Sequence, residues 1–326
     1  MKFSQNMSNF APSMKIITLS EGLKVAEPCV ATIGCFDGVH RGHQRVIRLL
    51  TEEAVRRGLT PAVITFDRLP RQLFDPAFRP QLLSTLGEKA TCLEALGVGL
   101  LVVLPFTKQL AALSAEVFMR KVLRSQLSVE VLLTGYDNRF GHDRSEGFDD
   151  YVRHGRAMGM EVLRGDVERV DSETAVSSTA IRRLLADEGR VDLMTEWLTR
   201  PYALTGRVVP GDHIGHELGF PTANIEPECG YKLIPANGVY AVWASLDGDE
   251  RRMAAMMNIG TRPTFEGHRQ TLEVHILKEV GDIYGRRLTV TFVRRLRAER
   301  RFDNRELLTD QLRQDRADAE SILYSD

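Results

Sequence analysis

The character of the sequence changes near residue 200, and this change limits the chain to folds with two differently built halves. Before it, short apolar runs alternate with amphipathic stretches, which is the pattern of parallel strands linked by helices. After it, β-branched alternation is broken by glycine and proline clusters, which is typical of short antiparallel strands. Because 326 residues exceed what one hydrophobic core usually serves, we predict two domains.

The first half, residues 15–186, is predicted to be a doubly wound α/β domain. A strand begins at 14–17, and further strands are expected to be buried on both faces of the sheet. Their ranges are 30–34, 62–66, 99–104 and 129–134. Helical spacing covers 45–50 and 117–123, and Ser114 is a suitable N-cap for the second of these helices.

A polar, helical connector over residues 187–200 leads into a second domain at 201–326. This domain is predicted to be a small antiparallel β-barrel followed by a C-terminal helix. The expected strands are 202–209, 238–245, 253–259, 272–277 and 288–293. Asp303 and Glu306 are predicted to form a capping box at the start of the helix. The helix then carries an apolar stripe of Leu308, Leu312, Ala319 and Ile322, which can pack on the barrel.

The charge balance argues against a nucleic-acid or membrane partner. The 43 Lys and Arg residues nearly cancel the 44 Asp and Glu residues, so the chain lacks the bulk attraction that polyanions require. The longest apolar run, 97–106, is about half a membrane span. With 43% hydrophobic and 27% charged residues, the composition is that of a globular protein rather than a disordered or fibrous one.

The four cysteines indicate a reduced compartment, and we expect a cytoplasmic protein. They are scattered without a Cys-x-x-Cys pair, unlike a disulfide framework or a zinc ribbon. Residues 1–13 are polar and patternless, and we assign them no function.

The first chemical motif reads GCFDGVHRGH at residues 34–43, directly after a predicted strand and before an amphipathic helix. This is where α/β sheets bind nucleotides. Glycines let the backbone approach a phosphate, and the helix start offers unpaired N–H groups. His40 and His43 can donate hydrogen bonds to the same anion. The residues alone leave two alternatives open: a pair of solvated histidines, or half of a zinc site.

The second motif reads VSSTAIR at residues 176–182, where hydroxyls meet a helix start and an arginine follows one turn later. By itself, this string is also explained by a simpler alternative, a good helix N-cap with no further role. Together, the two motifs resemble those of nucleotidylyltransferases. The form of the first motif is similar to that of bacterial FAD synthetases, which are bifunctional riboflavin kinase/FMN adenylyltransferases.

The resemblance implies roles for residues of the first domain. In this family the histidines, His40 and His43 here, stabilise charge on the triphosphate, while Ser178, Thr179 and Arg182 hold its β- and γ-phosphates. The implied nucleotide loop includes Gly34, Phe36, Gly38 and Gly42. The resemblance places Asp137, Arg139 and Phe140 beside the flavin or nucleotide, whereas from the residues alone 135–141 is a turn. One departure is FDRLP at 66–70, where the family often has FEPHP.

The barrel carries its own motifs, GRVVPGD at 206–212 and GFPTAN at 219–224. A loop with Gly211 and Gly219 can wrap a polyphosphate, and Thr222 and Asn224 offer the hard oxygen ligands that magnesium prefers. From composition alone these stretches are a pair of turns. They resemble the Pro-Thr-Ala-Asn motif of riboflavin kinases, whose Thr and Asn hold magnesium and nucleotide phosphate.

Two later stretches extend the kinase resemblance: NIGTRPT at 258–264 and LEVHI at 272–276. The resemblance implies that Glu273 is the base for the ribityl 5′-hydroxyl and that Asn258 and Arg262 lie on the flavin side. By alternation alone, Glu273 would be the wet face of a strand. His216 stands where these kinases often carry arginine.

The family therefore implies a Rossmann-like nucleotidylyltransferase domain followed by a riboflavin kinase barrel. Its substrates and products would be ATP with Mg²⁺, riboflavin, FMN and FAD, with no nucleic acid, membrane or obligate protein partner. Two rival hypotheses are a cytidylyltransferase fused to an unrelated barrel, and a flavin-binding or RNA-binding regulator that has lost catalysis. The intact Pro-Thr-Ala-Asn and Glu273 motifs argue against the first, and the retention of every expected catalytic side chain argues against the second.

Overall fold

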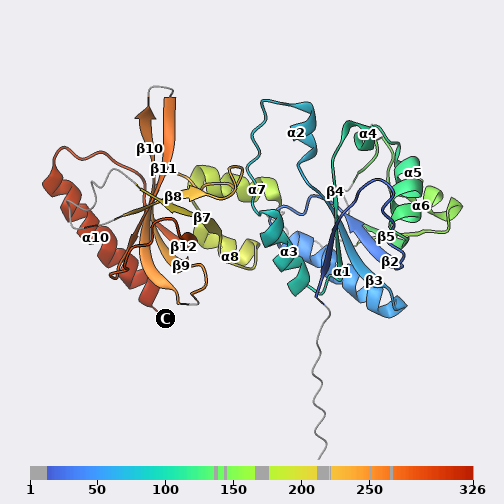
Figure 1. Ribbon diagram of the computed structural model, residues 1–326, viewed down its shortest axis with the longest axis horizontal. Helices are drawn as coiled ribbons and strands as arrows, with labels where there is room; N and C mark the ends of the chain where they lie inside the picture. The colour runs from blue at the N-terminus through green and yellow to red at the C-terminus, as the bar shows by residue number, and fades with distance from the viewer. Residues whose placement is uncertain are drawn as a thin grey trace, which may run out of the picture. The chain divides into compact units, whose positions relative to one another are not determined.

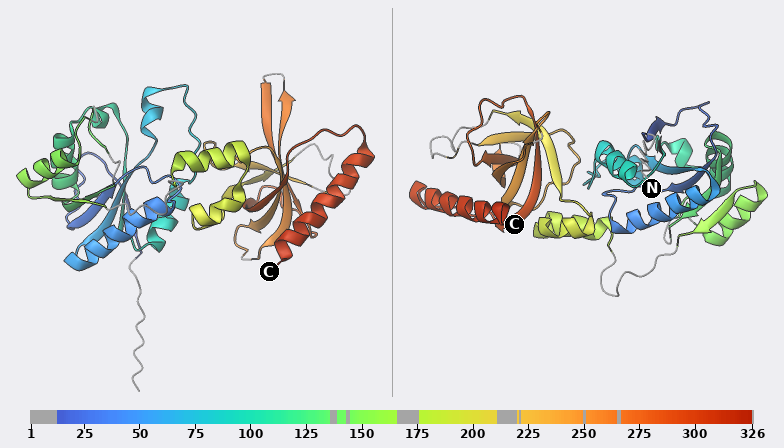
Figure 2. Two further views of the ribbon diagram at one scale, coloured as in Figure 1. Left: turned by 180° about the vertical axis from the view of Figure 1, so that it is seen from behind. Right: turned by 90° about the horizontal axis from the view of Figure 1, so that it is seen from below.

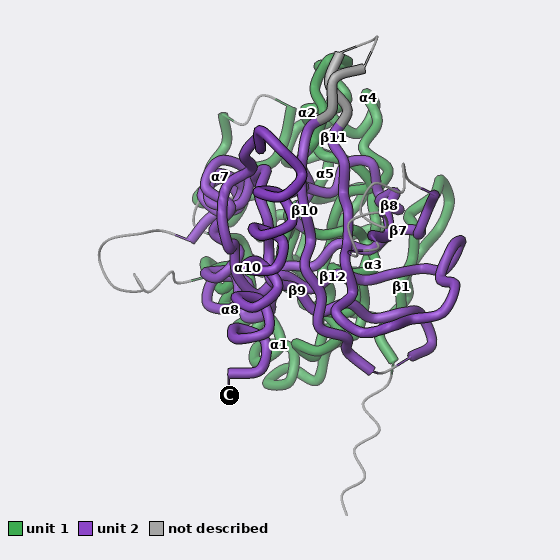
Figure 3. The backbone as a smooth tube through the Cα atoms, turned by 90° about the vertical axis from the view of Figure 1, so that its left-hand side faces the viewer, with its two compact units in different colours: residues 1–80, 84–175 green, residues 81–83, 176–326 purple. Residues whose placement is uncertain are grey.

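The computed structural model describes residues 13–135, 139–142, 145–165, 176–210, 220, 222–249, 251–264 and 267–325, with backbone alone for 262–264 and 267–269. The chain forms two compact units (Figures 1 and 3). Unit 1 comprises Met1–Pro80 and Ser84–Ala175, and unit 2 comprises Gln81–Leu83 and Val176–Asp326.

Unit 1 contains a six-stranded sheet in which every pairing is parallel. The strands are β1 (Lys15–Thr18), β2 (Cys29–Ile33), β3 (Thr60–Phe66), β4 (Leu100–Leu104), β5 (Val129–Thr134) and β6 (Glu161–Arg164). Their order is β1-β4-β3-β2-β5-β6, so the direction of winding reverses at β2. The predicted doubly wound domain is confirmed. β6 was not predicted.

Helices cover both faces of this sheet. They are α1 (Arg41–Arg57), α2 (Pro70–Phe74), α3 (Leu86–Ala95), α4 (Lys108–Ala111), α5 (Ala115–Phe118), the π-helix η1 (Met119–Gln126) and α6 (Phe148–Ala157). Buried residues of α1 and α3 share one core with Val63 and Leu101, while α5, η1 and α6 share the other with Ile33 and Leu132. Ser114 caps α5 as predicted, accepting from the Val117 N–H.

Unit 2 contains a closed barrel with strand order β10-β11-β8-β7-β12-β9 and antiparallel neighbours. The strands are β7 (Ala203–Val209), β8 (Ala223–Pro227), β9 (Gly238–Leu246), β10 (Met253–Thr264), β11 (Gly267–Ile276) and β12 (Arg287–Arg297). Short helices precede it: α7 (Ser178–Arg183), η2 (Leu184–Glu188), η3 (Val191–Leu193) and α8 (Met194–Trp197). Their apolar residues join the barrel core. The predicted barrel is confirmed, although β8 was not predicted.

The C-terminal helix α10 (Arg305–Tyr324) runs along the outside of the barrel (Figure 2). Ala319 and Leu323 are buried there against β9 and β10, with Leu312 and Ile322 partly buried beside them. The predicted capping box at Asp303 is wrong. The N-cap is Asn304, whose Oδ1 accepts from the Leu307 N–H at 2.9 Å, one residue further along the chain.

An almost fully buried carboxylate on α10, Asp315, binds the helix to the barrel. Its oxygens accept from Arg297 Nε at 2.9 Å, from Arg297 Nη2 at 2.7 Å and from Gln311 Nε2 at 2.7 Å. Asp315 is 1% exposed, and Arg297 stands near the end of β12. This pair fixes the helix on the side of the barrel where Arg297 lines a cavity.

Replacing Asp315 by alanine is expected to lower the free energy of unfolding of unit 2 by about 3–5 kcal/mol, because it leaves the Arg297 guanidinium without its buried partner. Urea denaturation of the full chain measures the change. Asp310→Ala on the same helix breaks an ion pair whose side chains are both 70% exposed, so it should change stability by less than about 1 kcal/mol. Equal effects of the two variants would contradict this assignment.

Candidate active sites

The connection from β2 to α1 lies at the edge where the winding of the unit 1 sheet reverses. In such sheets this edge, at the carboxyl ends of the strands, is where ligands bind. The predicted residues lie together on this connection and on the first turn of α1. They are Gly34, Phe36, Gly38, His40, Gly42 and His43, and we call residues 34–43 the phosphate loop.

The phosphate loop has a strained backbone. Phe36 has a φ of 46° and the β-branched Val39 a φ of 43°, both in the left-handed region that residues other than glycine rarely adopt. Two hydrogen bonds to Ser84 brace the loop: the Gly38 N–H donates to Ser84 Oγ at 2.9 Å, and the Ser84 N–H donates to an Asp37 oxygen at 3.1 Å. Strain of this kind persists only where the surroundings hold it, and it is common at functional sites.

The two histidines of the loop stack on each other, with ring centroids 3.6 Å apart. His40 is the N-cap of α1, and its Nδ1 accepts from the backbone N–H of His43 at 3.4 Å. A neutral ring that accepts at Nδ1 carries its proton at Nε2, so it can donate from there. The ring of Phe36 meets His43 edge-on at 5.2 Å.

Burial lowers the pKa of His43 well below its usual value, and the nearby charges of His40 and Lys89 lower it further. His43 is therefore a neutral imidazole at neutral pH, able to donate an N–H but without a permanent charge. Among the described residues, no three His, Cys, Asp or Glu side chains are grouped to hold a metal ion. The zinc alternative thus has no further ligands in that part of the chain.

The segment that follows β5 was expected to be a simple turn, but Phe140 at its end packs against Tyr151. Phe140 is half-buried, stacks on Tyr151 at 4.2 Å and accepts at its carbonyl from the Tyr151 hydroxyl at 3.1 Å. Arg139 is exposed, whereas Asp137 lies outside the described residues. The packing of Phe140 is a structural role that the sequence did not indicate.

The second predicted phosphate motif begins α7 and belongs to unit 2. The N-cap of α7 is Ser177, whose hydroxyl accepts from the Ala180 N–H at 3.2 Å. Because Ser177 caps α7, the predicted hydroxyls of Ser178, which is partly buried, and Thr179, which is exposed, are not the capping groups of this helix. Arg182 donates from Nε to the Gln81 carbonyl at 2.8 Å, also within unit 2.

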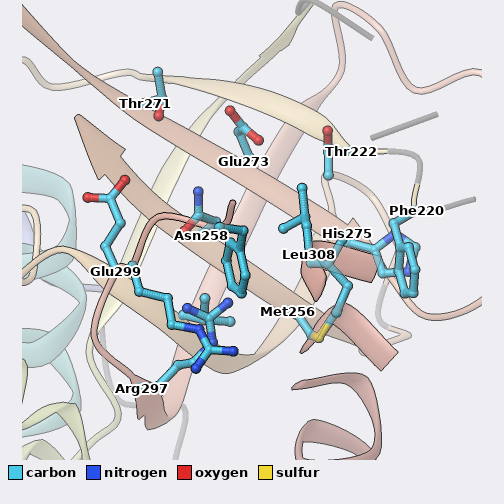
Figure 4. A pocket seen from close by; sticks show the side chains of 14 residues that line it. Phe220, Thr222, Met256, Asn258, Thr271, Glu273, His275, Arg297, Glu299 and Leu308 are labelled. Atoms are coloured by element: carbon cyan, nitrogen blue, oxygen red, sulfur yellow. The ribbon is translucent and has the colours of Figure 1, made fainter. Parts of the chain in front are cut away.

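A cavity of about 340 Å³ opens in unit 2 among β10, β11, the end of β12 and α10 (Figure 4). The predicted residues Thr222, Asn258 and Glu273 all line it. Glu273 pairs in register with Asn258 on β10 and with Asn224 on β8, so the three side chains project from the same face of the sheet. Thr222, Asn224 and Glu273 thus gather the hard oxygen donors that suit magnesium.

The cavity is lined by polar, charged and apolar side chains. Figure 4 shows the oxygens of Thr222, Thr271 and Glu273 along one side, with Phe220 and Met256 across from them. A second cavity of about 450 Å³ also reaches Thr222, together with residues 276–284. Thr222 thus lies between two cavities of unit 2.

The sequence missed several residues of this site. His275 is 7% exposed and lines both cavities; strand alternation from Glu273 would have placed it on the same face. Arg297 and Glu299 also line the first cavity. Gly211 and Gly219 lie outside the described residues, as does the side chain of Arg262.

Comparison with known proteins gives matches over both units. The family model for FAD synthetase matches residues 23–180, and that for riboflavin kinase matches residues 198–323. A bifunctional riboflavin kinase/FMN adenylyltransferase of Escherichia coli (strain K12) is 38% identical over 93% of this chain and 96% of its own. The enzyme of the same description from Pseudomonas fluorescens is 39% identical over 90% of this chain and 93% of its own.

A solved structure from Streptococcus pneumoniae matches with a TM-score of 0.85 and 29% identity, covering 95% of this chain and 99% of the other. It is described as a macrolide-efflux protein. No helix in the described part of the present chain is long and apolar enough to cross a membrane. We take only the shared fold from this structure, because the curated relatives match almost end to end and the two family models match both halves of the chain. The chain belongs to the family of bifunctional riboflavin kinase/FMN adenylyltransferases.

Proposed function

We propose that unit 2 phosphorylates riboflavin to FMN, with Glu273 as the base. The observation that carries this assignment is the row of Asn258, Glu273 and Asn224 across three paired strands, beside a cavity with an apolar wall. The ribityl 5′-oxygen attacks the γ-phosphorus of ATP, the bond to ADP breaks, and Glu273 accepts the hydroxyl proton. Positioning and charge neutralisation supply most of the rate, as in other phosphoryl transfers.

Thr222 and Asn224 would hold the Mg²⁺ that accompanies ATP, with phosphate oxygens and water completing its octahedron. Asn258 and Arg262 would face the flavin, and Gly211 and Gly219 would let the backbone wrap the phosphates. The support comes from the oxygen donors gathered around Glu273 and from the kinase motif that supplies them.

Thr222→Ala is expected to impair FMN formation and to raise the magnesium concentration needed for half-maximal rate by roughly tenfold, since one metal-oxygen contact is lost. A magnesium titration of kinase turnover measures this. Thr195→Ala, an exposed position on α8, is the control and should behave as the wild type. If Thr222→Ala keeps both the rate and the magnesium requirement, the metal must be held elsewhere.

The second reaction would be adenylylation of FMN. An FMN phosphate oxygen attacks the α-phosphorus of ATP, and pyrophosphate leaves against His40, His43, Ser178, Thr179 and Arg182. Asp137, Arg139 and Phe140 would border the flavin. The adenylyltransferase domain would occupy residues 15–186 and the kinase domain 201–326, joined by 187–200. In the compact units, residues 176–200 group with the barrel.

The substrates can be tested directly. Purified protein is incubated with riboflavin, magnesium and either ATP or CTP, and the flavins are resolved by chromatography. FMN and FAD should form with ATP alone. A cytidine-containing product would support the cytidylyltransferase alternative, and the absence of any product would support the non-catalytic one. A cytoplasmic location and independence from a protein partner remain predictions from the sequence.

A further inference from the structure

The start of α3 braces the phosphate loop at a third point, through a buried lysine. Lys89 donates from Nζ to the Cys35 carbonyl at 2.6 Å and to Thr65 Oγ1 at 3.1 Å. Lys89 is only 8% exposed. Lysine is rarely buried to this extent, because its ammonium loses its hydration there. A buried ammonium therefore needs strong partners, and here the partners belong to the loop and to β3.

The carbonyl that Lys89 holds lies at a critical point of the loop. Cys35 directly precedes Phe36, the first residue with a left-handed backbone, and its carbonyl also accepts from Thr65 Oγ1 at 3.2 Å. Two donors on one oxygen fix the orientation of the peptide between Cys35 and Phe36. Phe36 in turn packs edge-on against His43. The contact of Lys89 thus reaches the histidine pair through two consecutive residues, Cys35 and Phe36.

Lys89 also supplies charge at this place. Burial lowers its own pKa, whereas the Asp37 carboxylate opposes that change. The charged groups that act on His43 are His40, which stacks on its ring, and Lys89, which approaches from α3. The ammonium therefore adds positive potential where an anion would bind.

We propose that Lys89 is a positioning residue for adenylyl transfer: it holds the peptide between Cys35 and Phe36 so that the phosphate loop keeps the conformation that receives the triphosphate. This inference rests on the proposed function of the loop. Lys89 acts through the loop backbone and does not itself touch the reacting atoms.

Lys89→Met keeps an unbranched side chain only one atom shorter but removes its charge and its donors. FAD formation from supplied FMN should fall by roughly 10²-fold, because small displacements of a positioned group have effects of this size. The KM for ATP should rise as well, while riboflavin phosphorylation stays unchanged. Removing a nearby positive charge should raise the titration midpoint of His43, followed by NMR. A lysine that does not position the phosphate loop would leave FAD formation and the KM for ATP unchanged in the folded variant.

Three further variants complete the test. Lys121→Met changes an exposed lysine of η1 and should have no effect. Lys89→Arg, which keeps charge and donors, should restore part of the rate and the His43 midpoint. Thr65→Val removes the second donor to Cys35 and should lower FAD formation roughly fivefold. If Lys89→Met does not fold, Lys89→Arg and Thr65→Val test the proposal in its place. A wild-type rate of FAD formation in Thr65→Val, together with no FAD formation in folded Lys89→Arg, would overturn it.

The outcome separates this inference from the function on which it rests. Wild-type kinetics and His43 titration in folded Lys89→Met, together with loss of FAD formation in His43→Ala, would overturn the role of Lys89 alone. Normal FAD formation in both variants would overturn the assignment of the loop itself.

Discussion

Glu273→Gln is expected to lower the turnover of riboflavin to FMN by roughly 10²–10⁴, while the affinity for riboflavin changes little. Glutamine keeps the size and polarity of the side chain, and it can still sit between Asn224 and Asn258 in the sheet register. It cannot accept the proton of the attacking hydroxyl. Steady-state kinetics with riboflavin, and separately with FMN, measure the two reactions. Supplied FMN should still become FAD at the wild-type rate.

The control for this prediction is Glu226→Gln, an exposed carboxylate on the neighbouring strand β8, which should leave both reactions unchanged. A structural role for Glu273 would appear instead as a lower unfolding temperature and weaker riboflavin binding. Near-normal kinase turnover in Glu273→Gln would remove this residue from the mechanism.

His43→Ala should suppress FAD formation by roughly 10²–10³ while sparing FMN formation, since loss of one donor at a reacting phosphate has effects of this size. His43 is partly buried in the phosphate loop of unit 1, whereas the kinase cavity is lined by residues of unit 2. Flavin chromatography after incubation with riboflavin and MgATP should show FMN accumulating without FAD.

His43→Asn is the matched variant, because its amide can still donate an N–H. It should retain more FAD formation than alanine does. The pKa of His43 lies well below its usual value, so the free protein should keep a neutral His43 throughout the neutral range; protonation should be confined to acid pH. Equal loss of both activities in folded His43→Ala would show that the two sites are not separate.

The regular parts of both units could be predicted because burial on one or both faces leaves a periodic pattern. β2 and β4 are buried at every position and read as continuous apolar runs. The sequence did not predict β8, because Ile225 is the one buried residue of this strand and the strand follows a segment that contains glycine and proline. The start of α10 was misplaced by one residue, since Asp303 and Asn304 are both good capping residues and the choice depends on the local backbone.

The candidate sites could be predicted less completely than the fold. The residue types of the phosphate loop, and the resemblance of the Glu273 strand to riboflavin kinases, led to these site predictions. Strand register decides which side chains share a face, and the meeting of Asn258, Glu273 and Asn224 depends on it. Lys89 was not predicted as a site residue, because a lysine beside a glutamate on a helix normally indicates a solvated surface.

The central claim, that one chain carries two independent sites, is tested most directly by mixing two variants. Glu273→Gln and His43→Ala are each incubated with riboflavin and MgATP, alone and in equal amounts together, and FAD is measured by chromatography. Alone, Glu273→Gln should leave riboflavin nearly unchanged and His43→Ala should stop at FMN. Together they should form FAD, because FMN released by one is the substrate of the other. If FMN accumulates in the mixture and no FAD forms, the two reactions do not reside in separate sites.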